Sequence, residues 1–232
     1  MKILPWSPSA IDDFVNCPRS FYGKRVLKKF PYVETPEQKY GTYVHKCFEN
    51  AQSGVIVNGR ASLGVLPDDL KVHQPFMQRL WDKPGMHFLE WKGGFDKKAQ
   101  PCAFFAQDVW CRLVIDYIKV SEASRSGYLV DYKTGKPHQK FKQLYLYCIY
   151  VFAMFPYVDL INAQFYWTQT RDVTKKVIGR DEVPELWKHF IPDLKQYAEA
   201  FKTDTWQERP SGLCNGWCPD TECDHWKPKR TT

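Results

Sequence analysis

The most informative stretch of the chain is Gly127-Tyr-Leu-Val-Asp131-Tyr-Lys133-Thr-Gly135, in which an acid and a lysine lie two residues apart. Its aromatic and branched residues favour a strand, and side chains alternate between the two faces of a strand. Asp131 and Lys133 would therefore share a face. An acid that holds a divalent cation, beside a lysine that orients water or steadies phosphate charge, suits metal-assisted hydrolysis. The alternative is an ion pair on the strand surface, which is common and contributes little to stability.

A second acid, Asp116, lies in the apolar and β-branched segment Arg112–Val120. A carboxylate in such a strand is costly unless it is paired, hydrogen-bonded or bound to a metal. The polar residues 121–126, closed by Gly127, are typical of a hairpin connection. We therefore expect the two strands to pair and to bring Asp116 beside Asp131.

Two helices are expected to flank these strands. Residues 139–155 form a long apolar pattern that ends at Pro156, with Gln143 and Tyr147 one turn apart on one face. Residues 36–52 form an amphipathic pattern that carries His45 and Glu49 beside its apolar stripe. That stripe, which we expect to be buried, consists of Tyr40, Val44, Cys47, Phe48 and Ala51. Taken alone, a histidine in such a place is more often a packing residue than a ligand.

Other elements complete the expected core. Strands are predicted at residues 159–168 and 173–178, and one helix is predicted to run through residues 183–203. A further strand at residues 86–95 contains Glu90, to which the pattern assigns no role.

Three of the eight cysteines, Cys214, Cys218 and Cys223, are crowded into ten residues that have no apolar pattern. Their spacing differs from that of zinc ribbons and from the bacterial ferredoxin run. The cluster indicates a metal or a metal–sulfur centre. The alternatives are a zinc ion, for which His225 is a possible substitute ligand, and thiols that bind nothing.

Taken in chain order, Asp116, Asp131-Tyr132-Lys133 and Gln143-x3-Tyr147 resemble the core of the PD-(D/E)XK nuclease superfamily. The chain is similar in particular to the RecB-like branch, which includes phage and CRISPR-associated exonucleases. Two features carry that closer resemblance. One is Gly41-x3-His45 on the upstream helix, and the other is a cysteine set formed by Cys17 with Cys214, Cys218 and Cys223.

The resemblance implies an α/β fold of the restriction-endonuclease kind, with a central mixed β-sheet flanked by helices and a C-terminal lobe held by cysteines. It implies an active site in which Lys133 orients the attacking water and Gln143 and Tyr147 position the DNA strand. The implied ligands of Mg²⁺ or Mn²⁺ are His45, Asp116, Asp131 and the backbone carbonyl of Tyr132.

The resemblance also implies an iron–sulfur centre. In the RecB-like branch a [4Fe–4S] cluster is held by one upstream cysteine and three near the C-terminus. Here Cys17 of the first helix would join Cys214, Cys218 and Cys223 in a loop at residues 206–226. Zn²⁺ on the same four thiolates is the alternative.

The composition agrees with one nuclease domain over residues 1–232 that binds DNA. The formal charge is +7, from 33 Lys and Arg against 26 Asp and Glu, which has the sign needed for a polyanion. No run of apolar residues is long enough to cross a membrane, so we expect a protein of the bacterial, or phage-infected, cytoplasm without membrane partners. Recombination or replication proteins are possible partners, and the oligomeric state is not predicted.

The predicted function is metal-dependent hydrolysis of DNA by two-metal-type chemistry, with exonuclease action on DNA ends or single strands. One alternative is a structure- or site-selective endonuclease. The other is a non-catalytic DNA-binding module that retains the nuclease fold.

Overall fold

The computed structural model describes residues 3–57 and 60–228, which form two compact units. The larger, which we call the sheet unit, consists of Glu34–Leu186. The other, which we call the terminal unit, combines the chain up to Val33 with the chain from Trp187 onwards. None of the helices within the described ranges combines the length and the apolar character needed to span a lipid bilayer.

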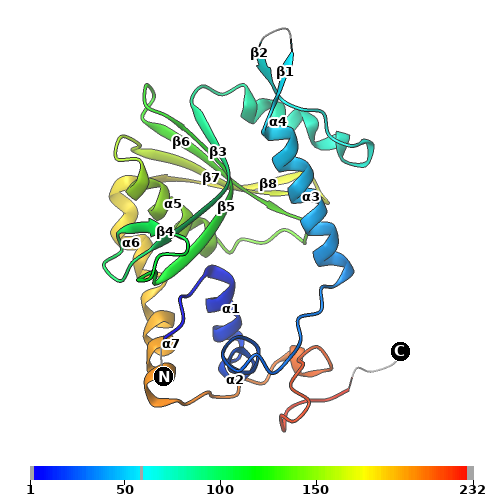
Figure 1. The fold of residues 1–232 in the computed structure, drawn as a ribbon, viewed down its shortest axis with the longest axis vertical. Helices are drawn as coiled ribbons and strands as arrows, with labels where there is room; N and C mark the ends of the chain where they lie inside the picture. The colour runs from blue at the N-terminus through cyan, green and yellow to red at the C-terminus, as the bar shows by residue number, and fades with distance from the viewer. Residues whose placement is uncertain (1–2, 58–59, 229–232) are drawn as a thin grey trace. The chain divides into compact units, whose positions relative to one another are not determined.

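The sheet unit is built on a six-stranded mixed β-sheet with the strand order β4-β3-β5-β6-β7-β8 (Figure 1). Strands β6 and β7 are parallel, and every other neighbouring pair is antiparallel. The strands are β3 (Met86–Phe95), β4 (Pro101–Ala103), β5 (Cys111–Ser121), β6 (Ser126–Lys133), β7 (Leu160–Trp167) and β8 (Asp172–Gly179). A separate hairpin pairs β1 (Val55–Val57) with β2 (Arg60–Ser62). The predicted mixed α/β fold is confirmed.

Helices cover both faces of this sheet. Helix α3 (Pro36–Gln52), the 3₁₀ turn η2 (Asp68–His73) and α4 (Gln74–Trp81) pack on the face that presents Tyr132 and Tyr166. Gln143 of helix α5 (Lys142–Met154) contacts Asp131, which is adjacent to Tyr132 on β6. Because adjacent residues of a strand point to opposite faces, α5 lies on the other face of the sheet. The catalytic candidates of β6 therefore lie between two helical layers.

Local sequence signals fix the ends of these helices. Thr35 and Gln38 form a reciprocal capping box at the start of α3, and Pro36 occupies the first helical position. At the C-terminal end of α5, the guanidinium of Arg180 donates hydrogen bonds to the carbonyls of Phe152 at 2.9 Å and Phe155 at 2.7 Å. These bonds satisfy carbonyl groups that the helix itself leaves without donors.

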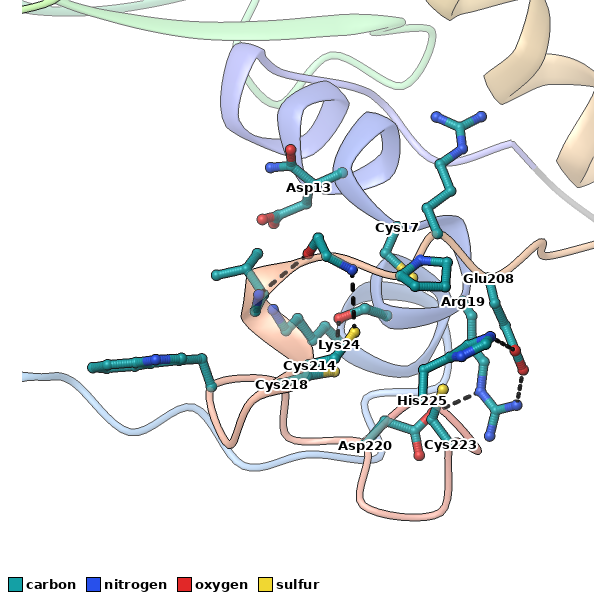
Figure 2. Close-up of a pocket in the computed structure, with 17 residues that line it drawn as sticks. Asp13, Cys17, Arg19, Lys24, Glu208, Cys214, Cys218, Asp220, Cys223 and His225 are labelled. Carbon is teal, nitrogen blue, oxygen red and sulfur yellow. Dashed lines mark hydrogen bonds and ion pairs between the residues drawn. The ribbon is translucent and has the colours of Figure 1, made fainter. Parts of the chain in front are cut away.

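The terminal unit packs helices from both ends of the chain. They are α1 (Pro8–Asn16), α2 (Pro18–Phe21), the π-helical turn η1 (Tyr22–Val26), α7 (Ile191–Thr203) and the 3₁₀ turn η4 (Gly212–Cys214). Its aromatic core consists of Phe14, Phe21, Tyr197, Phe201 and Trp206. The C-terminal loop returns to α2, where Arg19 contacts Asp220 and Glu208 (Figure 2).

Two sequence-based expectations are wrong. The single helix predicted at residues 183–203 is two helices, α6 (Val183–Lys188) and α7, because Pro192 starts a new helix and cannot continue the old one. Tyr40, expected in the buried stripe of α3, is 45% exposed, whereas Val44 and Phe48 are fully buried. The first turns of α3 thus extend beyond the layer that covers the rest of the helix.

Candidate metal and catalytic site

The acid and the lysine of β6 lie on one face of the strand, as their spacing predicts. The Nζ atom of Lys133 is 2.5 Å from Oδ2 of Asp131. The Asp131 side chain is only 3% exposed, so this contact is not a surface ion pair. The antiparallel register joins Tyr117 to Val130, and its next step places Asp116 next to Asp131. The two acids therefore meet where β5 and β6 lie side by side.

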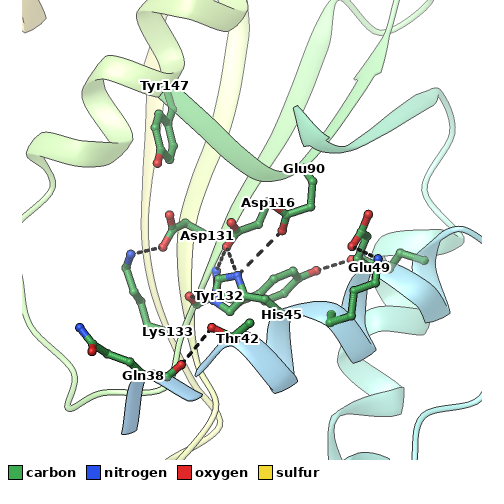
Figure 3. Close-up of polar contacts among 12 residues, drawn as sticks. Gln38, Thr42, His45, Glu49, Glu90, Asp116, Asp131, Tyr132, Lys133 and Tyr147 are labelled. Carbon is green, nitrogen blue, oxygen red and sulfur yellow. Dashed lines mark hydrogen bonds and ion pairs between the residues drawn. The ribbon is translucent and has the colours of Figure 1, made fainter. Parts of the chain in front are cut away.

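Asp116 and the backbone of Tyr132 are tied together. Oδ2 of Asp116 accepts the N–H of Tyr132 at 2.7 Å, and the carbonyl oxygen of Tyr132 lies 3.0 Å from Nε2 of His45. The other ring nitrogen of His45, Nδ1, is 3.4 Å from Oδ2 of Asp116. Helix α3 thus carries its histidine to the end of β6, between the two strands that hold the acids (Figure 3).

Glu90 of β3 completes this group through an unusual backbone conformation. Its φ is +44°, in the left-handed region that residues other than glycine seldom adopt. Side chains of β3 do not alternate regularly between the two faces at this point. Phe88 and Trp91, three residues apart, contact each other and both contact Phe155, so they share a face. Oε1 of Glu90 consequently lies 3.9 Å from Nδ1 of His45. Strained residues of this kind occur at functional sites when the surrounding structure holds them.

These side chains could hold a divalent cation. His45, Glu90 and Asp116 each offer one ligand atom, and the three atoms lie within 4.8 Å of one another. Asp131 adds a second observation, because its buried Oδ2 accepts no hydrogen bond of good geometry from the described residues, although Lys133 lies close to it. Carboxylate and carbonyl oxygens with one imidazole suit magnesium or manganese. The residues present therefore fit the divalent metal ion that the sequence implies.

The electrostatics of the site point the same way. Burial raises the pKa of the Glu90 carboxyl to about 7, and the charge of Asp116 adds to this effect. Burial also raises the pKa of Asp131 to about 6, against the influence of Lys133, which lowers it. Burial lowers the pKa of His45, but the hydrogen bond and charge of Asp116 outweigh it and raise this pKa to about 9. The crowded acids favour a positive charge between them. In the metal-free protein the protonated imidazole of His45 supplies that charge.

Gln143 of α5 links the acid to the lysine. Its Oε1 accepts a hydrogen bond from Nζ of Lys133 at 2.9 Å. Its Nε2 donates to Oδ1 of Asp131 at 2.9 Å and to the hydroxyl of Tyr147 at 2.7 Å. Both amide hydrogens and the amide oxygen are therefore used, and the amide holds Asp131 and Lys133 in a fixed relation.

The profile of the PD-(D/E)XK nuclease superfamily matches residues 5–223. The chain belongs to this superfamily. A crystal structure of a candidate exonuclease from Eubacterium rectale is similar to this PD-(D/E)XK protein, with a TM-score of 0.54 and 11% identity over 98% of this chain and 91% of that chain. At this identity the likeness shows a shared fold. The structure of SSO0001 has a TM-score of 0.45 and 12% identity over 94% of this chain and 84% of that chain, and it adds no argument. No curated protein matches the sequence.

Within this PD-(D/E)XK site, the structure brings together all the residues that the sequence singled out: His45, Asp116, Asp131, Tyr132, Lys133, Gln143 and Tyr147. It adds Glu90, whose only signal in the sequence is an acid inside an expected strand. Among the described residues, Glu49 is not one of the three whose ligand atoms cluster, and its carboxylate pairs with Lys46 at 2.8 Å.

The four cysteines of the terminal unit line one cavity of about 110 Å³ (Figure 2). Cys17 comes from the end of α1, and Cys214, Cys218 and Cys223 come from the C-terminal loop. All four are free thiols. The N–H of Ser211 donates to Sγ of Cys214 at 3.5 Å, a polarity that suits a thiolate. His225 also lines the cavity, but its Nε2 lies 3.1 Å from a carboxylate oxygen of Glu208.

Proposed function

We propose that this chain is a divalent-metal-dependent deoxyribonuclease of the RecB-like branch that acts as an exonuclease on DNA ends or single strands. The observation that carries the proposal is the meeting of two groups at the end of β6. One is the set of ligand atoms from His45, Glu90 and Asp116, and the other is the buried pair of Asp131 and Lys133.

The metal ligands we propose are His45, Asp116, Asp131 and the carbonyl of Tyr132, with Glu90 as an additional ligand. A bound Mg²⁺ or Mn²⁺ would lower the pKa of water and neutralise charge that develops on the phosphate. The residues of the chain pre-arrange this group, because the N–H of Tyr132 holds Asp116 and the Tyr132 carbonyl faces His45. The ligand atoms thus need little movement to converge.

Lys133 is the residue we propose to act on the reacting atoms. Its ammonium is anchored by Gln143 and Asp131, and the side chain as a whole remains 28% exposed, so it is accessible to a phosphate bound at the site. In that place it can orient the attacking water and stabilise negative charge on the phosphate oxygens. Gln143 acts as a positioning residue for Lys133. Tyr147 stabilises Gln143 through its hydroxyl.

A cleavage assay tests this function. End-labelled single-stranded and double-stranded DNA, and a circular single strand, are incubated with Mg²⁺, Mn²⁺ or EDTA. The proposal predicts release of short products from the linear substrates with metal only, and an intact circle. Cutting of the circle would instead identify an endonuclease with the same active site.

We further propose that the cysteines of the terminal unit hold a [4Fe–4S] cluster. Four thiols in one cavity, drawn from both ends of the chain, suit a soft metal centre. Zn²⁺ on the same four thiolates is the alternative.

Anaerobic purification followed by metal analysis tests the centre. The proposal predicts brown protein with about four iron and four sulfide per chain. Colourless protein with stoichiometric zinc would support the alternative instead.

A further inference from the structure

A hollow lies directly beside the catalytic residues of the sheet unit. It has a volume of about 490 Å³ and is lined by Pro36, Glu37 and Tyr40 of α3, by Thr134, Gly135 and Lys136 after β6, and by Gln169. The two walls meet closely, since a Cβ atom at Gly41 would lie 3.3 Å from Oγ1 of Thr134. The hollow therefore begins one residue beyond Lys133.

Tyr40, which lines the hollow, and Tyr43, one turn further along α3, both carry exposed rings. Tyr40 is 45% exposed and Tyr43 is 41% exposed, and their ring centroids are 6.4 Å apart. The hydroxyl of Tyr43 donates to Oδ1 of Asp69 at 3.1 Å, which holds that ring in place. Two adjacent exposed aromatic side chains at the edge of a hollow provide a surface on which nucleobases can stack.

The charge of the neighbouring loop suits a phosphate backbone. Residues 135–140, which connect β6 to α5, are all exposed and include Lys136 and Lys140. No Asp or Glu occurs between Lys133 and Asp159. Glu37 is the one acid among the residues that line the hollow, and it lies in the first turn of α3. The loop thus places the cation of Lys136 in the wall of the hollow that the residues after β6 form, and Lys140 follows four residues further along the loop.

We propose that this hollow binds the unpaired end of a DNA strand, with bases stacked on Tyr40 and Tyr43 and phosphates contacting Lys136 and Lys140. This inference rests on the proposed nuclease function and specifies that the strand end which enters the site is unpaired. Bases inside a duplex are stacked on each other and cannot offer their faces to a side chain. A strand held in the hollow would pass Thr134 and enter the site at Lys133.

Fluorescence anisotropy with two labelled strands tests the stacking. One strand is a short oligothymidine, and the other has the same length and phosphates but lacks every base. Binding is measured with Ca²⁺ in place of Mg²⁺. The double variant Tyr40→Ala/Tyr43→Ala should lose about 5- to 150-fold in affinity for oligothymidine per stacked base. It should bind the abasic strand as the unaltered protein does.

Matched variants separate stacking from other effects. Tyr40→Phe/Tyr43→Phe keeps both rings and should bind both strands normally. Phe105→Ala removes another aromatic side chain, 80% exposed in the same unit, and should change neither affinity. Lys136→Ala should weaken both strands alike and lower the slope of log affinity against log salt by about 0.7.

Equal affinity of the double alanine variant and the unaltered protein for oligothymidine would overturn the inference. So would an equal loss on both strands, because bases would then not be recognised. These outcomes are independent of cleavage. If no substrate is cleaved with any metal, the proposed nuclease function fails, whereas the binding comparison still gives its own result.

Discussion

Glu90 offers a sharp test of the acidic group, because its removal should have opposite effects with and without metal. Replacing Glu90 by Gln keeps the size of the side chain and removes one negative charge from a site that also holds Asp116. In the metal-free protein this charge is repelled and poorly solvated, so its loss should stabilise the fold. With metal bound the same charge is a ligand, so its loss should weaken the stabilisation that metal provides.

The size of the effect follows from the pKa. Burial raises the pKa of Glu90 from 4.5 to about 7. A shift of this size corresponds to about 3 kcal/mol between the ionised and protonated forms. The side chain is 30% exposed, so solvent screening reduces this to about 1–2 kcal/mol. Because the folded-state pKa lies above the unfolded-state pKa, stability from this group is present below pH 4.5 and lost as pH rises through 7. Glu90→Gln should therefore gain little near pH 4.5 and about 1–2 kcal/mol at pH 8.

Urea unfolding followed by tryptophan fluorescence measures these quantities. We would compare the unaltered protein, Glu90→Gln and the control Glu122→Gln, which changes an exposed acid in the β5–β6 turn. Each is unfolded at pH 4.5 and pH 8 in EDTA and at pH 8 in MnCl₂. The Glu90 variant should be more stable than the unaltered protein in EDTA at pH 8 and should gain less from Mn²⁺. A variant with unchanged stability in EDTA and a full response to Mn²⁺ would refute the placement of Glu90 in the site.

Four further substitutions, at three positions, test the other proposed roles. Lys133→Ala should bind DNA almost normally in Ca²⁺ but cleave it about 10²–10³-fold more slowly in Mg²⁺, as measured by single-turnover kinetics; loss of binding with an unchanged rate would make Lys133 a DNA anchor. Gln143→Met removes two hydrogen bonds to charged groups and should cost about 3 kcal/mol of unfolding free energy. Gln143→Glu should lose more stability than the unaltered protein between pH 5 and pH 8, because a second carboxylate then faces Asp131, and an equal pH dependence of the two proteins would contradict the contact. Cys218→Ser should lower the metal content and the melting temperature together, and an unchanged melting curve with full metal content would exclude Cys218 as a ligand.

Much of the site was predictable because it follows from strand alternation and helix periodicity. The spacing of Asp131 and Lys133 placed both on one face of β6, and the polar turn after Ser121 implied the pairing of β5 with β6. The bounds of α3 agree with the pattern because Thr35, Pro36 and Gln38 are strong start signals. Each of these features depends on residues that are neighbours in sequence.

The features that were missed depend on tertiary context. A strand pattern does not reveal the positive φ of Glu90, beside which Phe88 and Trp91 both pack on Phe155. The exposure of Tyr40 was not predictable from the apolar stripe of α3, because the stripe does not show where the covering layer ends. The contacts of Gln143 with Asp131 and Lys133 were likewise not predictable, because they depend on where α5 lies on the sheet.

Cleavage of an end-labelled single strand by the unaltered protein and by Asp116→Asn, with Mg²⁺, Mn²⁺ or EDTA, tests the central claim most directly. Asparagine can still accept the hydrogen bond from Tyr132, so the variant should fold normally, as its urea unfolding would verify. We predict short products from the unaltered protein with Mg²⁺ or Mn²⁺, none in EDTA, and none from the variant under any condition. Cleavage in EDTA, or full activity of the folded variant, would contradict a metal-dependent nuclease site built on Asp116.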